Sequence, residues 1–487
     1  MHDPASSSHS PAYPAQWKNA ALLVIGHGST ENPDSSAPTH AMVDALRERN
    51  LFAEVHAAFW KEEASMREAL AMINADTVYV VPGFISEGYF TKEIIPRELG
   101  IPQGESEATV QGKRLIYSRP VGVHPSMTPL LLKRAREVAG DISPADCTLL
   151  IVGHGTGLNT ESRLIVEQRA EEIRSSEASF AEVVDTYMEE KPLISDWAEI
   201  ATKDHVVIVP FFIADGLHSY QDIPVMLGIE TEPTAAASQR DVFRNNPYSL
   251  RGKTLYYSSA IGTDPSMADV ILDLVRDATN TDESIPAPKS PRANQKFLEA
   301  KLGSGELTIG QVLVRKTADG EFSLTHVDDR ESDSLRAINA HDELRRMTLF
   351  DATDEYRPLR SANNLQSGWV VTVPSIDAVL EALDFLYPAA VGVARSQEQG
   401  TLPVCEISDK FNRQTGMYHI TGLANEEQTE EVVAARCAAH CLKTPLWEQK
   451  SKPSSPAAGT NTIPLLCPEA CNMLVADARR VVKRDRS

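Results

Sequence analysis

The chain has 487 residues, of which 42% are hydrophobic and 24% charged, and this length and composition predict about three or four soluble globular domains. Its formal net charge of −21 argues against nucleic acid or an anionic membrane as the main partner. No apolar run approaches the roughly 18–20 residues of a membrane span, and no signal-peptide layout opens the sequence, so a cytoplasmic location is expected. Residues 1–19 are polar and rich in Pro and Ser, which predicts a disordered leader.

An internal repeat follows the leader. Four pairs of segments match in order: ALLVIGHG (21–28) with TLLIVGHG (148–155), VVPGFISEGYF (80–90) with IVPFFIADGLH (208–218), KEIIP (92–96) with YQDIP (220–224), and LIYSRPVGVHPSM (115–127) with LYYSSAIGTDPSM (255–267). The offset is 127 to 128 residues and widens to 140 for the last pair. Ordered matches at a nearly constant offset indicate two copies of one supersecondary unit, predicted over residues 20–145 and 146–277.

Within each copy, apolar strand-like runs alternate with helix-like stretches. Strands are expected at 21–28, 54–60, 77–84 and 114–120 of the first copy, and at 148–155, 181–188, 205–212 and 254–260 of the second. Continuous apolar strands that alternate with helices predict a parallel sheet covered on both faces. Two such α/β units in tandem are expected to face a cleft at the carboxyl ends of their strands.

The remainder of the chain is expected to form two smaller domains. Residues 278–297 are rich in Pro, Ser and charge and read as a linker. A small α+β module is predicted over 298–400, with a hairpin at 307–327 and an amphipathic helix at 375–387. The last domain, 401–487, carries two pairs of cysteines.

Three matched positions carry different chemistry in the two copies. The second copy has His154, Glu189 and His218 where the first has His27, Lys61 and Phe90. An imidazole–carboxylate–imidazole set can bind a first-row divalent metal or move protons, whereas an ammonium repels a cation. The second copy is therefore predicted to be the active half. His27 is a further candidate catalytic residue, but it is equally compatible with a turn cap, a relic of the duplication, a substrate contact or a helper ligand. The glycines around each histidine lack a nucleotide-binding fingerprint and are expected to permit a tight turn.

The two cysteine pairs are expected to form one site. Cys437 and Cys441 have the i, i+4 spacing of one helix face, and the proline after Cys467 favours a helix that would carry Cys467 and Cys471. Two such pairs can converge as four thiolates, which hold either zinc or a 4Fe–4S cluster. Cys147, at the start of an apolar strand, is expected in the core.

The motifs of the second copy, G-H-G, Y-M-E and A-D-G-L-H-S-Y-Q-D-I-P, resemble those of the sirohydrochlorin chelatases, the cobaltochelatase–ferrochelatase family. The resemblance covers about residues 20–275 and implies two flavodoxin-like chelatase units. It also implies insertion of Co²⁺ or Fe²⁺ into sirohydrochlorin or a related tetrapyrrole, in cobalamin or siroheme biosynthesis. The metal would be held by His154 and His218, with Glu189 at the family's acidic position. The segment containing RCAAHCLKTPLW and PLLCPEACN resembles an iron–sulfur domain appended to some members, which favours a 4Fe–4S cluster over zinc.

Several alternatives stay open on the sequence alone. Glu189 can orient a histidine or accept a pyrrole proton. The carboxylates of the macrocycle require cations, for which the candidates are Arg163, Lys92, Arg119 and Lys191. The chief alternative function is a non-catalytic metal- or tetrapyrrole-binding protein or a cluster-based redox sensor, and a macrocycle reductase is a further one. The sequence leaves open the choice among cobalt, iron and nickel, the role of the cluster and the oligomeric state.

Overall fold

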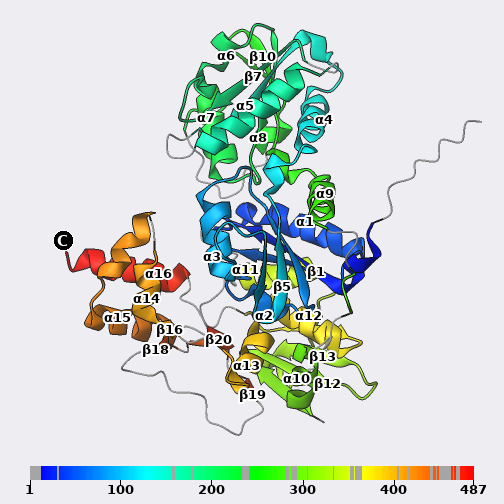
Figure 1. Cartoon of the computed structure of the whole chain (residues 1–487), viewed down its shortest axis with the longest axis vertical. Coiled ribbons are helices and arrows are strands. Elements are labelled where there is room, and N and C mark those ends of the chain that lie inside the picture. The colour runs from blue at the N-terminus through cyan, green and yellow to red at the C-terminus, as the bar shows by residue number, and fades with distance from the viewer. Residues whose placement is uncertain are drawn as a thin grey trace, which may run out of the picture. The chain divides into compact units, whose positions relative to one another are not determined.

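A computed structural model gives the fold of the chain (Figure 1). It describes residues 13–29, 32–155, 160–176, 180–232, 241–279, 284–287, 293–303, 305–332, 334–350, 356, 365–402, 405–414, 416–438, 443–445, 447–448, 462–463, 465–467 and 472–486. The chain divides into two compact units. The first contains Met1–Gly26, Asp34–Ala57 and Ala75–Pro291, and the second contains His27–Pro33, Ala58–Asn74 and Arg292–Ser487. Among the described helices, none has the length and apolar character that crossing a bilayer would require.

The first repeat copy forms a five-stranded sheet with the order β2-β1-β3-β5-β4. Its strands are β1 (Ala20–Gly26), β2 (Glu54–Phe59), β3 (Thr77–Pro82), β4 (Glu107–Val110) and β5 (Lys113–Tyr117). Strands β1, β3 and β5 pair in parallel, whereas β4 is antiparallel to β5. Every residue of β1 and β3 is buried, as the unbroken apolar runs predicted. Strand β4, an edge strand without buried residues, was not predicted from the sequence.

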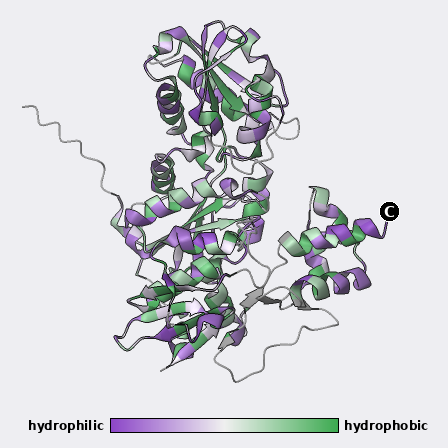
Figure 2. Cartoon of the chain, turned by 180° about the vertical axis from the view of Figure 1, so that it is seen from behind, coloured by the Kyte–Doolittle hydropathy of each residue, from purple (hydrophilic) through white to green (hydrophobic). Residues whose placement is uncertain are grey.

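The second copy repeats this topology strand for strand, with the order β7-β6-β8-β10-β9. Its strands are β6 (Cys147–Gly153), β7 (Glu182–Tyr187), β8 (His205–Pro210), β9 (Tyr248–Leu250) and β10 (Lys253–Tyr257). Only β9, the edge strand that was also missed, runs antiparallel to its neighbour. Figure 2 shows the central strands of the sheets as hydrophobic ribbons, in keeping with their complete burial. The predicted pair of parallel-sheet units is therefore confirmed, with an antiparallel edge added to each.

Helices cover both sheets. The first copy has α1 (Ala37–Glu48), α2 (Ala69–Met72), α3 (Ile95–Leu99) and α4 (Met127–Ala139), and the second has α5 (Thr160–Arg174), α6 (Trp197–Ile200), α7 (Ile223–Leu227), α8 (Asp241–Arg244) and α9 (Met267–Asp277). Helices α4 and α9 begin at the matched PSM motifs, as predicted.

The two copies exchange their closing helices. Helix α4 of the first copy packs on β8, β10 and α5 of the second copy, while α9 of the second copy packs on β3 and α1 of the first (Figure 1). One continuous hydrophobic core consequently includes residues of both copies. Arg169 of α5, only 1% exposed, joins the copies further by donating to the Val123 carbonyl at 2.9 Å and to Thr128 Oγ1 at 3.1 Å. Each sheet is thus completed by a helix from the other copy.

The residues just before β1 are ordered. A 3₁₀ turn, Ala15–Asn19, places the Trp17 side chain in the core, where it stacks on Phe52 with ring centroids 5.0 Å apart. The Trp17 indole donates to Thr279 Oγ1 at 2.9 Å. The disordered leader predicted over 1–19 therefore does not extend through this turn, because Trp17 supplies the apolar anchor that the polar composition concealed.

The third segment forms a six-stranded sheet with helices, ordered β14-β15-β13-β12-β11-β19. Its elements are α10 (Ala293–Leu302), β11 (Glu306–Ile309), β12 (Val312–Lys316), β13 (Phe322–His326), β14 (Arg336–Ala337), α11 (His341–Leu349), β15 (Trp369–Val373), α12 (Ile376–Leu386), α13 (Ala390–Glu398) and β19 (Thr462–Ile463). The helix predicted over 375–387 is confirmed as α12. The hairpin predicted over 307–327 has three strands rather than two, because the chain turns at Gly310, where φ is +58°.

The last segment is a small helical cluster with short strands. It contains β16 (Cys405–Glu406), α14 (Ile407–Asn412), a 3₁₀ helix (Gly416–Leu423), α15 (Glu426–Val433), a π-helical turn (Ala434–Ala438), β17 (Lys443–Pro445), β18 (Trp447–Glu448), β20 (Leu465–Cys467) and α16 (Asn472–Arg484). Its core is formed by α14, α15 and α16, through residues such as Phe411, Val432 and Leu474.

Candidate functional site

Three neighbouring strands of the second sheet bring the predicted site residues together. His154 follows the end of β6, Glu189 follows β7, and His218 lies beyond the turn after β8. These strands run parallel in the order β7-β6-β8, so their carboxyl ends meet at one edge of the sheet. The site therefore stands where ligands bind in parallel α/β sheets.

The two imidazoles lie against each other. The ring centroids of His154 and His218 are 5.0 Å apart and the rings are inclined by 75°. The Oε1 atom of Glu189 is 3.9 Å from Nε2 of His154. The three side chains remain accessible, with exposed fractions of 35% for His154, 58% for Glu189 and 48% for His218. Within the described part of the chain, no three His, Cys, Asp or Glu side chains converge closely enough to hold a metal ion by themselves.

A carboxylate orients His218. The Nδ1 atom of its ring is 2.6 Å from Oδ2 of Asp222, one turn further along the π-helical segment His218–Asp222. A carboxylate on one ring nitrogen fixes the tautomer and the plane of the imidazole and leaves the other nitrogen to bind a metal. His218 is thereby prepared to use Nε2 as a ligand atom.

Close packing explains the glycine after His154. Gly155 has φ +66°, and a Cβ atom there would lie 2.6 Å from Cβ of Tyr187. Any other residue would displace the end of β7, which leads directly to Glu189. The interpretation of these glycines as turn formers, rather than as a nucleotide cradle, agrees with this geometry.

A further carboxylate, that of Asp215, is buried in the turn that precedes His218. Asp215 is 7% exposed, and its Oδ1 atom accepts a hydrogen bond from the Ala260 amide at 2.7 Å. Burial raises the pKa of Asp215 to about 6. Because the ordinary pKa of an unfolded Asp is near 3.9, the folded state binds more protons than the unfolded state between these values. Stability is therefore lost as the pH rises towards 6.

The Asp215→Asn variant is expected to remove this pH dependence, because Asn keeps an acceptor for Ala260 but does not ionise. The free energy of unfolding of the variant, relative to the natural protein, should rise by about 1 kcal/mol between pH 5 and pH 7. Thermal unfolding at both pH values should show this as a difference in Tm that widens by about 2–4 °C.

A matched control is Glu87→Gln in the first copy. The Arg119 guanidinium holds the pKa of Glu87 below its ordinary value, so this substitution should add no pH dependence between pH 5 and pH 7. An unchanged Tm difference for Asp215→Asn over the same range would contradict the assigned titration.

The first copy holds an aromatic pair at the position matching His218. Phe90 stacks on Phe84, with ring centroids 5.5 Å apart and planes inclined by 19°. The equivalent pair in the second copy, Phe212 and His218, is 6.2 Å apart and inclined by 42°. An apolar stack therefore occupies the position that the second copy gives to an imidazole.

His27 belongs to a different compact unit from His154 and His218. Its Nδ1 atom is 2.8 Å from the Gly28 carbonyl oxygen, and its own carbonyl accepts from the Lys61 amide at 2.9 Å. Desolvation by the surrounding protein lowers the pKa of His27, and the Lys61 charge adds to this effect. The first-copy GHG turn thus has a cationic neighbour where the second has Glu189.

The third segment of the chain contacts the loop that follows the GHG motif of the first copy. Tyr356 donates from its hydroxyl to the Ser29 carbonyl at 2.8 Å, and the Ser29 amide donates to Oε1 of Glu62 at 2.5 Å. Glu62 is 4% exposed, and burial raises the pKa of Tyr356. The third segment also contacts α2, because Gly392 of α13 lies so close to the Ala71 carbonyl that a Cβ atom would be 1.9 Å from the oxygen.

The four predicted substrate-binding cations are not equivalent. Lys92 and Arg119 both pair with Glu87, at 3.2 Å and 2.8 Å. Arg163 pairs with Glu167 at 2.7 Å and Glu190 at 3.1 Å, and its guanidinium lies over the Tyr187 ring beside the second-copy site. Lys191 accepts from Arg163 through its backbone carbonyl. Lys191 is thus the candidate two residues after Glu189 in the chain, and Arg163 is the candidate that contacts the segment following Glu189.

The cysteine segments are partly described. Cys437 lies in the π-helical turn Ala434–Ala438, which packs against β17, and β17 pairs with β20, which ends at Cys467. The backbone therefore places the first cysteine of each pair on an element that contacts β17, which is compatible with a shared four-thiolate site. The expectation that both pairs lie on helices is wrong for Cys467, which ends a strand. Cys441 and Cys471 lie outside the described residues. Cys147 is buried at the start of β6, as predicted.

The fold and the site together define a tandem α/β protein in which one copy holds a histidine pair suited to divalent metals. Known protein families identify it further. A family model described as CbiX matches residues 21–138 and 148–278, which is both copies. The chain therefore belongs to the CbiX family of chelatases. Models described as the DR2241 stabilising domain and as a 4Fe-4S iron-sulfur cluster binding domain match residues 293–398 and 399–480.

Individual relatives agree with this assignment. A probable sirohydrochlorin cobaltochelatase of Halobacterium salinarum is 38% identical over 274 residues, which span 53% of this chain and 91% of the relative. A sirohydrochlorin cobaltochelatase of Methanopyrus kandleri is 30% identical over 144 residues, 27% of this chain and 95% of the relative. The crystal structure of DR2241 from Deinococcus radiodurans, described as a multi-domain protein similar to chelatases with two additional domains, superposes with a TM-score of 0.80 and 28% identity. That match covers 96% of this chain and 99% of DR2241.

Proposed function

We propose that the second copy inserts a divalent cobalt or iron ion into sirohydrochlorin or a closely related tetrapyrrole, in the biosynthesis of cobalamin or siroheme. The observation that carries the proposal is the pair of accessible imidazoles, His154 and His218, with centroids 5.0 Å apart at the carboxyl edge of the sheet. Neutral imidazole suits cobalt and iron and holds them less firmly than thiolates would, so the ion can be passed on. The names of the relatives point to the same reaction.

The residues divide the work of metal insertion. His154 and His218 hold the ion from the protein side and leave its other coordination positions to the macrocycle nitrogens. Insertion of a divalent ion releases two pyrrole protons. Glu189, which is 58% exposed and 3.9 Å from His154, is placed to accept one as general base, and the other passes to solvent, to which the site is open. Asp222 keeps His218 in its ligating orientation through the 2.6 Å contact to Nδ1.

An apolar side chain beside His218 supports a flat macrocycle as the substrate. Leu217 precedes His218 and is 45% exposed, which makes it one of the few large hydrophobic side chains that stand exposed among the described residues. At a metal site, such a side chain can contact the face of an aromatic ring and exclude water from it. A small hydrophilic substrate would gain nothing from this contact.

The cluster-binding domain supplies a thiolate site apart from this chemistry. We assign Cys437, Cys441, Cys467 and Cys471 as the ligands of a 4Fe–4S cluster, because the elements that carry Cys437 and Cys467 both contact β17. When bound, the cluster would link β20, which ends at Cys467, to the π-helical turn that carries Cys437. Metal insertion itself involves no change of oxidation state.

A direct test is anaerobic insertion by the full-length protein. Sirohydrochlorin with Co²⁺ or Fe²⁺ should change its absorption spectrum faster in the presence of the protein than with the metal alone, and with turnover beyond one equivalent. Comparison of the two metals at equal concentration assigns the preferred ion. Binding of metal and tetrapyrrole without acceleration would instead establish the non-catalytic binding protein.

A further inference from the structure

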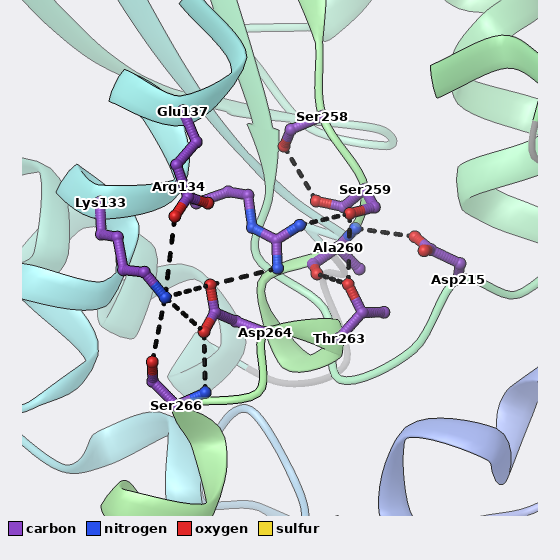
Figure 3. A network of polar contacts seen from close by, with 10 residues as sticks. All are labelled: Lys133, Arg134, Glu137, Asp215, Ser258, Ser259, Ala260, Thr263, Asp264 and Ser266. Carbon is purple, nitrogen blue, oxygen red and sulfur yellow. Dashed lines mark hydrogen bonds and ion pairs between the residues drawn. The ribbon is translucent and has the colours of Figure 1, made fainter. Parts of the chain in front are cut away.

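Two cations of the first copy reach across to the second copy through the exchanged helix α4. Lys133 Nζ is 3.0 Å and 3.2 Å from the two carboxylate oxygens of Asp264, and Arg134 Nη2 is 3.4 Å from Oδ2 of the same residue (Figure 3). Arg134 also donates from Nη1 to Ser259 Oγ at 2.6 Å. The Asp264 side chain is 1% exposed and that of Arg134 is 15% exposed. Arg134 therefore binds the loop 258–264 at two points from within a mostly buried position.

This loop is fastened to the turn that precedes His218. The Ala260 amide donates to Oδ1 of Asp215 at 2.7 Å, and the Gly262 amide donates to the Phe212 carbonyl at 2.9 Å. A Cβ atom on Gly262 would lie only 2.1 Å from the Ile213 carbonyl oxygen, so the two backbones are in direct contact. A shift of the loop must consequently shift the turn.

This turn determines the position of His218. Asp215 lies three residues before His218, and the Phe212 ring is 6.2 Å from the His218 ring. The positive charge of Arg134 favours the ionised form of Asp215 and so opposes the effect of burial on its pKa. Contacts therefore lead without a gap from α4 of the first copy, through the loop 258–264, to the metal-binding histidine of the second copy.

The first copy does not receive the same support. Its acidic residue, Glu87, pairs with Arg119 of its own copy at 2.8 Å, and Arg119 stands where the second copy has Ser259. On α9, the position that matches Arg134 is Leu274, which is 5% exposed. Helix α4 therefore places an arginine against the copy that has both histidines, whereas the matched position of α9 places a leucine against the first copy.

We propose that Arg134 is a positioning residue of the second-copy metal site, acting on His218 through the loop 258–264. The proposal rests on the proposed function in taking His154 and His218 as the metal-binding pair. Its role is not to contact the metal or the tetrapyrrole but to hold in place the turn that positions the His218 side chain. The first copy, although its own site is altered, thereby contributes to the geometry of the site in the second.

The test measures binding of Co²⁺ alone to the full-length protein, using the part of the Co²⁺ visible absorption that His218→Ala removes. Arg134→Leu, which installs the residue found at the matched position of α9, should weaken this binding by about 10-fold, the lower end of the effect of residues that orient metal ligands. Arg134→Lys should restore part of the affinity, because it keeps the charge near Asp264 but not the fork to Ser259. Ser259→Ala should weaken binding less than Arg134→Leu.

Lys133→Met is the matched control, because it also removes a cation from Asp264 but leaves the contact to Ser259. It should lower Tm to a similar extent as Arg134→Leu while leaving Co²⁺ affinity within about twofold, a difference that loss of stability alone would not produce.

Equal Co²⁺ affinity in Arg134→Leu, Ser259→Ala and the natural protein would overturn the proposal. If Arg134→Leu does not fold, the comparison of Ser259→Ala and Arg134→Lys with Lys133→Met decides it in the same way. If the natural protein binds Co²⁺ through His218 but inserts none, the proposed function fails while the positioning role is still measured. If His218→Ala removes no Co²⁺ signal, both are overturned.

Discussion

Replacement of His218 by alanine is expected to lower the rate of metal insertion by at least about 100-fold, the scale of a positioned catalytic group. Among the described residues, His218 and His154 are the two imidazoles at the site, and Asp222 at 2.6 Å from Nδ1 of His218 leaves its Nε2 atom for the ligand. Without His218, His154 would hold the ion as a single ligand next to solvent. His154→Ala should have an effect of the same size. Initial rates from tetrapyrrole absorption, with Co²⁺ and with Fe²⁺, measure both losses.

His205 provides the control within the same copy. It starts β8, at the opposite end of the strand from the site, and contacts Tyr256 with ring centroids 6.0 Å apart. His205→Ala should therefore leave the insertion rate within about twofold of the natural protein. His27→Ala should reduce the rate less than either second-copy variant. A larger loss for His27→Ala, with active His154 and His218 variants, would mean that the wrong copy has been assigned.

Replacement of Cys437 by serine is expected to abolish the iron–sulfur cluster. Protein prepared without oxygen should contain about four irons per chain and a broad thiolate-to-iron absorption, and the variant should lose both. The reason is that Cys437 sits on a π-helical turn packed against β17, the strand that pairs with the strand ending at Cys467. Replacement by serine should give the same result at each of the other three positions, Cys441, Cys467 and Cys471.

Cys147→Ser is the control for the cluster. Cys147 is buried at the start of β6 in the second copy, and its sulfur contacts the Ser143 carbonyl at 3.4 Å. This variant should retain its full iron content, although it can lose stability. Stoichiometric zinc without iron or sulfide in the natural protein would contradict the assignment of the four cysteines to an iron cluster.

The sequence was informative where the two copies could be compared. The repeated GHG motif and the exchange of Phe90 for His218 predicted residues that the structure brings within contact at one edge of the sheet. The same comparison contained a signal that was missed. Asp222 of the motif YQDIP stands opposite Ile94 of KEIIP, and this acidic residue proves to be the partner of His218. A carboxylate one helical turn from a candidate ligand is a pattern that sequence reasoning can detect.

Other features could not be read from the sequence, because local patterns do not specify partners distant in the chain. The amphipathic character of α4 and α9 shows which face of each helix is buried, but not which of two similar sheets receives it. The contacts of Arg134 therefore had no sequence signature. The buried Trp17 escaped prediction for a related reason, since a single aromatic residue in a polar segment gives no periodicity.

The exchange of α4 and α9 also bears on how such a chain can evolve. After duplication, each copy depends on the other for one covering helix. Deletion of either copy would therefore expose a face of the sheet in the other. Selection can then preserve the first copy for the helix that it lends, even when its own metal-binding side chains are lost. Its loops can then acquire other contacts, and in this chain the loop after its GHG motif accepts a hydrogen bond from Tyr356. A copy that lacks a complete metal site can in this way persist as the structural support of the copy that has one.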